Sequence, residues 1–109
     1  MSNYSSGEVV LVRYPFSDLS RAKVRPAVVV SAPHVSQDVL IVPLTSRTTA
    51  LLPGEFALKS WSQAGLNVAT AVKRGVYTVH QNLIAQRIGK LSDSDLQDLR
   101  SALRLWLAI

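Results

Sequence analysis

Short apolar runs separated by polar stretches dominate the chain up to residue 91. The runs are rich in valine and isoleucine and too short for typical helices, so they are characteristic of β-strands. Three long strands are predicted, over residues 8–14, 25–31 and 38–44. Shorter strands are predicted over 55–58, 66–72, 76–79 and 87–91, with a helical turn over 60–65 and a turn or short helix over 80–84.

The stretch from Val24 to Ser31 contains four valines and is apolar enough to be buried on both faces, which predicts a central strand. Pro26 cannot donate a hydrogen bond to a neighbouring strand, so we expect it at the first strand residue. Arg25 is then extended and lies just outside the sheet. Position alone leaves two interpretations open: a solvated flank, or a guanidinium presented by a rigid scaffold.

A helix is predicted from residue 92 to the end of the chain. Ser92 is a typical N-cap, and Asp95 completes a Ser-x-x-Asp capping box. Four apolar residues follow at helical spacing and predict a stripe that packs on the sheet: Leu96, Leu99, Leu103 and Trp106. Three more widen this surface, so the end of the helix is expected to contact a second subunit: Leu105, Leu107 and Ile109.

Many short strands with uneven loops and one terminal helix predict a mainly β fold, a compact and strongly bent antiparallel barrel closed by the helix. A chain of 109 residues is predicted to form one domain, residues 1–109. A domain this small buries a limited core, and 48% of its residues are hydrophobic, so self-association is expected.

Composition excludes several functions. The chain has no cysteine, which excludes disulfides, thiolate metal sites and cysteine nucleophiles. The first seven residues are polar, and no apolar run approaches the roughly 20 residues that span a bilayer. We therefore expect a cytoplasmic protein without a membrane partner.

The net charge is +5, with a pI near 10.1. Ten of the 12 Lys and Arg residues but only four of the seven Asp and Glu residues lie in residues 1–91, a balance of +6. A basic body favours a polyanionic partner such as nucleic acid, although a basic surface without a partner is the alternative.

Two polar segments carry candidate chemistry. The connection over residues 15–24 is too long for a tight hairpin and places Arg21 and Lys23 beside Arg25. Thr45, Ser46 and Arg47 follow the third long strand, where two hydroxyl groups and a guanidinium can form a phosphate or oxyanion site. Serine and threonine at a strand end are also ordinary turn formers, so this segment alone does not decide between the two interpretations.

Four blocks together resemble the MazF/PemK (Kid) family of toxin endoribonucleases: GEVVLVRYPFSDLS (7–20), KVRPAVVVS (23–31), VPLTSR (42–47) and IGKL (88–91) before a helix. The resemblance implies an SH3-like barrel of the CcdB/PemK type with a C-terminal helix. It also implies a homodimer that cleaves single-stranded RNA at short sequences without a metal or another cofactor. The partner it implies is a MazE-like antitoxin with an acidic tail.

The resemblance also implies residue roles. Arg25 matches the catalytic arginine of the Arg-Pro dipeptide, and Thr45 matches the catalytic threonine. The 2′-hydroxyl of RNA would attack the phosphate, leaving a 2′,3′-cyclic phosphate and a 5′-hydroxyl. Further RNA contacts are expected from a mainly basic set: Arg21, Lys23, Ser46, Arg47, Lys73, Arg74 and His80.

One departure concerns the general base. Many family members have Arg-x-Asp where this chain has Val72 and Arg74, so the usual carboxylate is absent. Histidine titrates near neutral pH, so His80 or His34 is a candidate replacement, with His80 preferred because it follows the basic segment; the alternative is that both are ordinary surface residues. Two alternatives therefore stay open: a protein that binds RNA without cleaving it, and a CcdB-like toxin that binds a protein target through its terminal helix.

Overall fold

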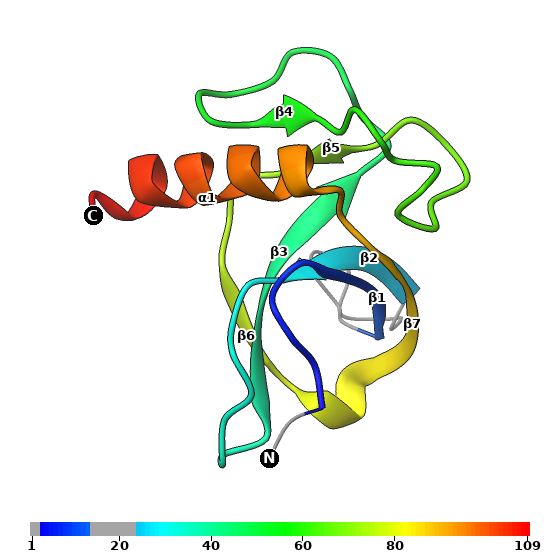
Figure 1. Cartoon of the computed structure of the whole chain (residues 1–109), viewed down its shortest axis with the longest axis vertical. Helices are drawn as coiled ribbons and strands as arrows, with labels where there is room; N and C mark the ends of the chain where they lie inside the picture. Colours follow the sequence, from blue (N-terminus) through cyan, green and yellow to red (C-terminus); the bar gives the residue numbers. More distant parts are fainter. Residues whose placement is uncertain (1–2, 14–23) are drawn as a thin grey trace, which may run out of the picture.

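The structure of the chain is a computed structural model that describes residues 3–13 and 24–109. Figure 1 shows a mainly β molecule with one long helix at the C-terminal end, as the sequence predicts. The described elements are β1 Glu8–Arg13, β2 Val24–Val29, β3 Asp38–Thr45, β4 Phe56–Ala57, β5 Ala71–Val72, β6 Tyr77–His80, a 3-10 turn at Gln81–Leu83, β7 Ile84–Lys90 and α1 Asp93–Leu107.

Strand β3 is the centre of the sheet. All strand pairs are antiparallel, and the strand order is β4-β5-β3-β2-β1-β7. Strand β6 pairs with the first half of β3, while β5 pairs with its last two residues. Strands β4 and β7 end this order and do not pair with each other in the described residues, so the sheet is not closed.

Two apolar clusters form the core. One lies between the sheet and α1 and includes Val9, Val28, Val42, Leu44, Leu58, Ala64, Val72, Leu91 and Leu99. The other includes Val10, Val12, Ala27, Val29, Val39, Ile41, Val79 and Ile84. Adjacent residues of β1 and β2 therefore contribute to different clusters, because successive side chains of a strand point to opposite faces. This confirms that the valine run of β2 is buried on both sides.

The sequence predicts Pro26 at the first residue of the strand, but in the structure it is the third residue of β2. Pairing of β2 with β3 begins only at Ala27, whereas pairing with β1 already starts at Val24. At Pro26 the strand therefore has a neighbour on one side only, and proline is compatible with such an edge. Arg25 is exposed, but it lies within β2 and pairs with Val12 of β1 rather than lying just outside the sheet as predicted.

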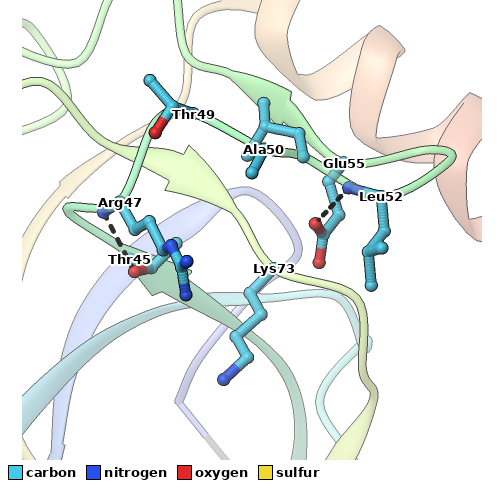
Figure 2. A pocket seen from close by; sticks show the side chains of 8 residues that line it. Thr45, Arg47, Thr49, Ala50, Leu52, Glu55 and Lys73 are labelled. Carbon is cyan, nitrogen blue, oxygen red and sulfur yellow. Dashed lines mark hydrogen bonds between the residues drawn. The ribbon is translucent and has the colours of Figure 1, made fainter.

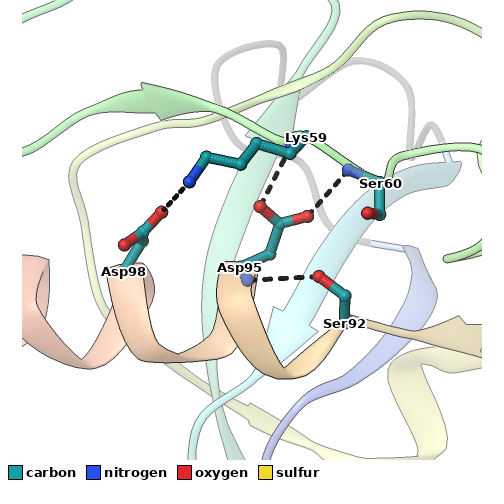
Figure 3. Close-up of polar contacts among 5 residues, drawn as sticks. All are labelled: Lys59, Ser60, Ser92, Asp95 and Asp98. Carbon is teal, nitrogen blue, oxygen red and sulfur yellow. Dashed lines mark hydrogen bonds and ion pairs between the residues drawn. The ribbon is translucent and has the colours of Figure 1, made fainter.

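The helix begins as predicted, but the capping box is only half formed (Figure 3). The hydroxyl oxygen of Ser92 accepts a hydrogen bond from the Asp95 amide at 3.2 Å. The Asp95 carboxylate does not return to Ser92; it accepts hydrogen bonds from the amides of Lys59 and Ser60, each at 3.0 Å. Asp95 is fully buried, so it fixes the segment after β4 to the first turn of α1.

The predicted apolar stripe of α1 packs on the first cluster. Leu99 is buried, and Leu96, Leu103 and Trp106 are partly buried against the same cluster. The indole N–H of Trp106 donates to the carbonyl oxygen of Pro53 at 3.0 Å. The helix thereby holds the loop before β4 as well as the sheet.

Two predicted strands differ by several residues from their bounds in the structure. The alternating segment 66–72 is strand only at Ala71–Val72, and residues 66–70 form a loop. The last strand begins at Ile84 rather than at residue 87. In the described parts of the chain, no helix has the length and apolarity needed to cross a membrane.

Candidate functional site

The end of strand β3 separates two hollows in the surface. Thr45 is the last strand residue and is half-buried, and its register partner in β5 is Ala71. Its hydroxyl oxygen accepts a hydrogen bond from the Arg47 amide at 3.1 Å, which turns the chain away from the sheet. Thr45 lines both hollows.

The larger hollow, here called the Arg25 cleft, has a volume of about 540 Å³. It brings Arg25 and Ser46 together with Thr45, although Arg25 comes from β2, Thr45 ends β3 and Ser46 directly follows β3. Its other walls come from β1, β2, β3, β7 and the loop 65–70: Leu11, Pro26, Leu44, Gly65, Leu66, Asn67, Val68, Thr70, Gln86 and Ile88. The polar groups of this described lining are a guanidinium, hydroxyls and amides, without a carboxylate or an imidazole.

The smaller hollow, here called the Lys73 pocket, has a volume of about 290 Å³. Figure 2 shows Arg47, Glu55 and Lys73 reaching it from three different segments of the chain. The remaining lining residues come from the loop before β4: Thr49, Ala50, Leu51 and Leu52. The apolar pair Leu51-Leu52 therefore lines the pocket beside these three charged side chains.

An irregularity between β5 and β6 positions Lys73. Val72 pairs with Leu44 and Tyr77 pairs with Ile41, so four residues on this side face two residues of β3. The Lys73 amide donates to the carbonyl oxygen of Pro43 at 3.0 Å, which keeps Lys73 at the sheet edge. Gly75 closes the irregularity with φ 153°, and a Cβ there would lie 2.8 Å from the Tyr77 ring. Extra residues of this kind often redirect side chains next to functional sites.

Glu55 joins this irregularity to the loop before β4. One carboxylate oxygen accepts a hydrogen bond from the Leu52 amide at 2.7 Å, and the other accepts one from the Arg74 amide at 2.8 Å. Burial raises the pKa of Glu55, but the hydrogen bonds from the Arg74 and Leu52 amides and the charges of Lys73 and Arg74 outweigh it and lower the pKa below its ordinary value of 4.5. Glu55 is therefore ionised at neutral pH.

The other residues predicted for the site are more scattered. Arg74 is exposed beside Lys73, but it lines neither hollow. His80 pairs with Asp38 at the opposite end of β3, and its ring Nδ1 accepts a hydrogen bond from the Asn82 amide at 3.1 Å. The structure thus does not bring His80 to Thr45. Arg21 and Lys23 lie outside the described residues.

Sequence reasoning missed Glu55, Asn67 and Gln86. Glu55 meets Arg74 only because the two-residue strands β4 and β5 pair at Phe56 and Val72, and no local pattern signals that pairing. Gln86 reaches the Arg25 cleft because β7 pairs with β1 opposite Leu11. Asn67 lies in the loop that was predicted as a strand.

A family model for PemK-like, MazF-like toxins of type II toxin–antitoxin systems matches residues 5–107 of the chain. The chain belongs to this family. It is therefore a MazF-like toxin of a toxin–antitoxin system, as its sequence blocks indicate. No curated protein matches it by sequence.

Solved structures of MazF toxins have the same fold as this MazF-like chain. It is similar to the Mycobacterium tuberculosis toxin MazF-mt6, with a TM-score of 0.74 and 19% identity over 94% of this chain and 97% of that one. A MazE-MazF structure from Deinococcus radiodurans gives a TM-score of 0.78 and 17% identity over 97% of each chain. A mycobacterial endoribonuclease in complex with its cognate antitoxin gives 0.76 and 16% identity over 97% of this chain and 96% of that one.

Proposed function

We propose that this toxin is a metal-independent endoribonuclease that cleaves single-stranded RNA at short sequences. The observation that carries the proposal is the Arg25 cleft, where a guanidinium from β2 and two hydroxyl-bearing residues from the end of β3 line one hollow. The proposed enzyme acts in the cytoplasm as a homodimer of single-domain chains.

The proposed reaction is a transesterification within the RNA. The ribose 2′-oxygen forms a bond to the adjacent phosphorus, the bond from phosphorus to the 5′-oxygen breaks, and a 2′,3′-cyclic phosphate and a 5′-hydroxyl remain. Arg25 binds the phosphate through paired N–H donors, since a guanidinium matches two phosphate oxygens and carries a permanent positive charge in proteins. The Thr45 hydroxyl donates to a non-bridging oxygen and stabilises charge as it develops. The 2′-hydroxyl loses its proton to water and the departing 5′-oxygen takes one up from water, because the described lining of this cleft has no carboxylate or imidazole.

The Lys73 pocket supports binding of the flanking RNA. Arg47 and Lys73 are exposed cations on the far side of Thr45 from Arg25, so together they extend a line of positive charge past the end of β3. RNA phosphates are the expected counter-charges, and the net charge of +5 favours their approach. We retain Arg21, Lys23 and Arg74 as further RNA contacts in this proposal.

The proposed protein partner is a MazE-like antitoxin with an acidic tail. Two similar structures are complexes of a toxin with MazE or a cognate antitoxin. An acidic segment matches the charge of Arg25, Arg47 and Lys73, so antitoxin and RNA are expected to compete for the same basic surface.

Primer extension on a long RNA, in the presence of EDTA, tests this function. Wild type is expected to produce stops at a recurrent short sequence, and Arg25→Ala is expected to remove them. Arg100→Ala is the matched control, because Arg100 is an exposed arginine on α1 that lines neither hollow. Salt-sensitive RNA binding without stops would instead identify a non-cleaving RNA-binding toxin, and neither binding nor stops would favour a protein-targeting toxin of the CcdB type.

A further inference from the structure

Glu55 is a negatively charged residue in the Lys73 pocket, whose other charged residues, Arg47 and Lys73, are positive and suited to RNA. Its two oxygens are fixed by backbone amides from two different loops. Among the described residues, no basic side chain lies within the 4.0 Å ion-pair distance of its oxygens. A carboxylate has about four acceptor positions, so each oxygen keeps one that faces away from its amide donor.

The Lys73 pocket combines acceptors and donors in a defined arrangement. Glu55 is ionised and offers acceptors only, whereas Lys73 and Arg47 offer donors only. The side chains of Leu51 and Leu52 form an apolar wall beside them. A volume of about 290 Å³ is at the lower end of small-molecule sites, which suits one nucleobase rather than a longer segment.

We propose that the Lys73 pocket binds a guanine base next to the cleaved phosphate, with Glu55 accepting from N1–H and N2–H and Lys73 donating to O6. Of the four RNA bases, only guanine presents two adjacent donors followed by an acceptor on its Watson–Crick edge. Adenine, cytosine and uracil each present a single donor group to a carboxylate, and bases in single-stranded RNA are read along this edge. The guanine ring then lies against Leu51 and Leu52.

The place of the base relative to the reaction follows from Thr45. This residue lines both hollows, so a base in the Lys73 pocket belongs to a nucleotide adjacent to the phosphate bound by Arg25. The inference rests on the proposed endoribonuclease function for its biological meaning. The test uses RNA that cannot be cleaved. The result for guanine binding is therefore independent of whether the protein is an endoribonuclease.

The test compares binding of short oligouridines with 2′-fluoro sugars, which lack the attacking hydroxyl, and with guanosine, inosine or adenosine at the centre. Inosine is the decisive probe, because it lacks only the N2 amino group of guanosine. Wild type is expected to bind the guanosine oligomer roughly tenfold more tightly than the inosine or adenosine oligomer. Glu55→Gln is expected to reduce the guanosine-to-inosine ratio to about one.

Two control variants separate base recognition from charge. Asp38→Asn removes the same negative charge at the opposite end of β3 from Thr45, at a residue that does not line the Lys73 pocket, and is expected to leave the guanosine-to-inosine ratio unchanged. Lys73→Met is expected to weaken binding of guanosine and inosine equally, because both carry O6. A wild-type ratio near one overturns the proposal, as does a ratio that persists in Glu55→Gln. If Glu55→Gln does not fold, the guanosine-to-inosine ratio of wild type is the deciding measurement, and a value near one overturns the proposal.

Discussion

At the residue scale, the site depends on Thr45, which ends the central strand and lines both hollows. A half-buried threonine at the end of a strand has a restricted side chain, because β-branched residues have few χ1 rotamers. Its hydroxyl accepts from the Arg47 amide and keeps its own proton for donation. Thr45 therefore combines a structural and a chemical role.

Substitution of Thr45 separates these roles. Thr45→Val keeps the shape but removes the donor to the phosphate, and the rate constant for RNA cleavage is expected to fall by about 100-fold. Thr45→Ser keeps the hydroxyl and is expected to retain activity within roughly tenfold of wild type, as single-turnover kinetics can measure. Equal activity of Thr45→Val and wild type would exclude the hydroxyl from the reaction.

Glu55 links pH to stability. Its pKa is lowered in the folded protein, so the ionised carboxylate stabilises the fold above its ordinary pKa of 4.5, and this contribution is lost as the pH falls through the folded pKa. The free energy of unfolding of wild type is expected to exceed that of Glu55→Gln at pH 7. Denaturant titrations should show this difference shrinking below about pH 4.5. A difference independent of pH would contradict the assigned role of the two amide hydrogen bonds.

At the element scale, most of the secondary structure could be predicted from the apolar runs of the strands and from the capping of the helix. The three long strands were predicted from their apolar runs, and α1 was predicted from its N-cap Ser92 and its apolar spacing. Both kinds of signal lie within the element itself. Strands β4 and β5 lie within the predicted strands 55–58 and 66–72, but their length of two residues was not predicted, since it depends on the pairing of β5 with β3 and of β4 with β5. Thr45 and Arg25 were found by motif, whereas Glu55 enters the site through this non-local pairing.

The buried carboxylate of Asp95 is the main polar contact that the structure adds to the predicted helix. Asp95→Ala would leave the amides of Lys59 and Ser60 without their acceptor in a buried position. The free energy of unfolding is expected to fall by about 3 kcal/mol, as chemical denaturation can measure.

Asp98→Ala is the matched control for this prediction. Asp98 lies one turn further along α1, and its exposed ion pair with Lys59 spans 3.7 Å. Exposed pairs contribute about 1 kcal/mol or less, so its loss is expected to change stability by under about 1 kcal/mol. Equal effects of Asp95→Ala and Asp98→Ala would show that the buried hydrogen bonds are not what holds the segment after β4 to the helix.

At the scale of the whole molecule, apolar surface remains at the end of α1. Ile109, Leu105 and Leu107 are 83%, 61% and 51% exposed. In the proposed homodimer this surface contacts the second subunit, as the sequence suggests. Leu107→Asp combined with Ile109→Asp is therefore expected to shift the protein towards monomers in analytical ultracentrifugation.

Val35→Asp provides the control for the dimer prediction. Val35 is 76% exposed but lies in the turn between β2 and β3. Its substitution is expected to leave the oligomeric state unchanged. Dissociation by Val35→Asp but not by the α1 variant would place the interface elsewhere.

The central claim is that Arg25 and Thr45 form the reaction centre of a metal-independent endoribonuclease. The most direct measurement is the single-turnover cleavage rate of a defined single-stranded RNA in EDTA, with mass spectrometry of the new ends. The account predicts 2′,3′-cyclic phosphate and 5′-hydroxyl ends for wild type and Arg100→Ala, and a rate at least about 100-fold lower for Arg25→Ala. Undiminished cleavage by Arg25→Ala, or products with linear 3′-hydroxyl ends, would contradict it.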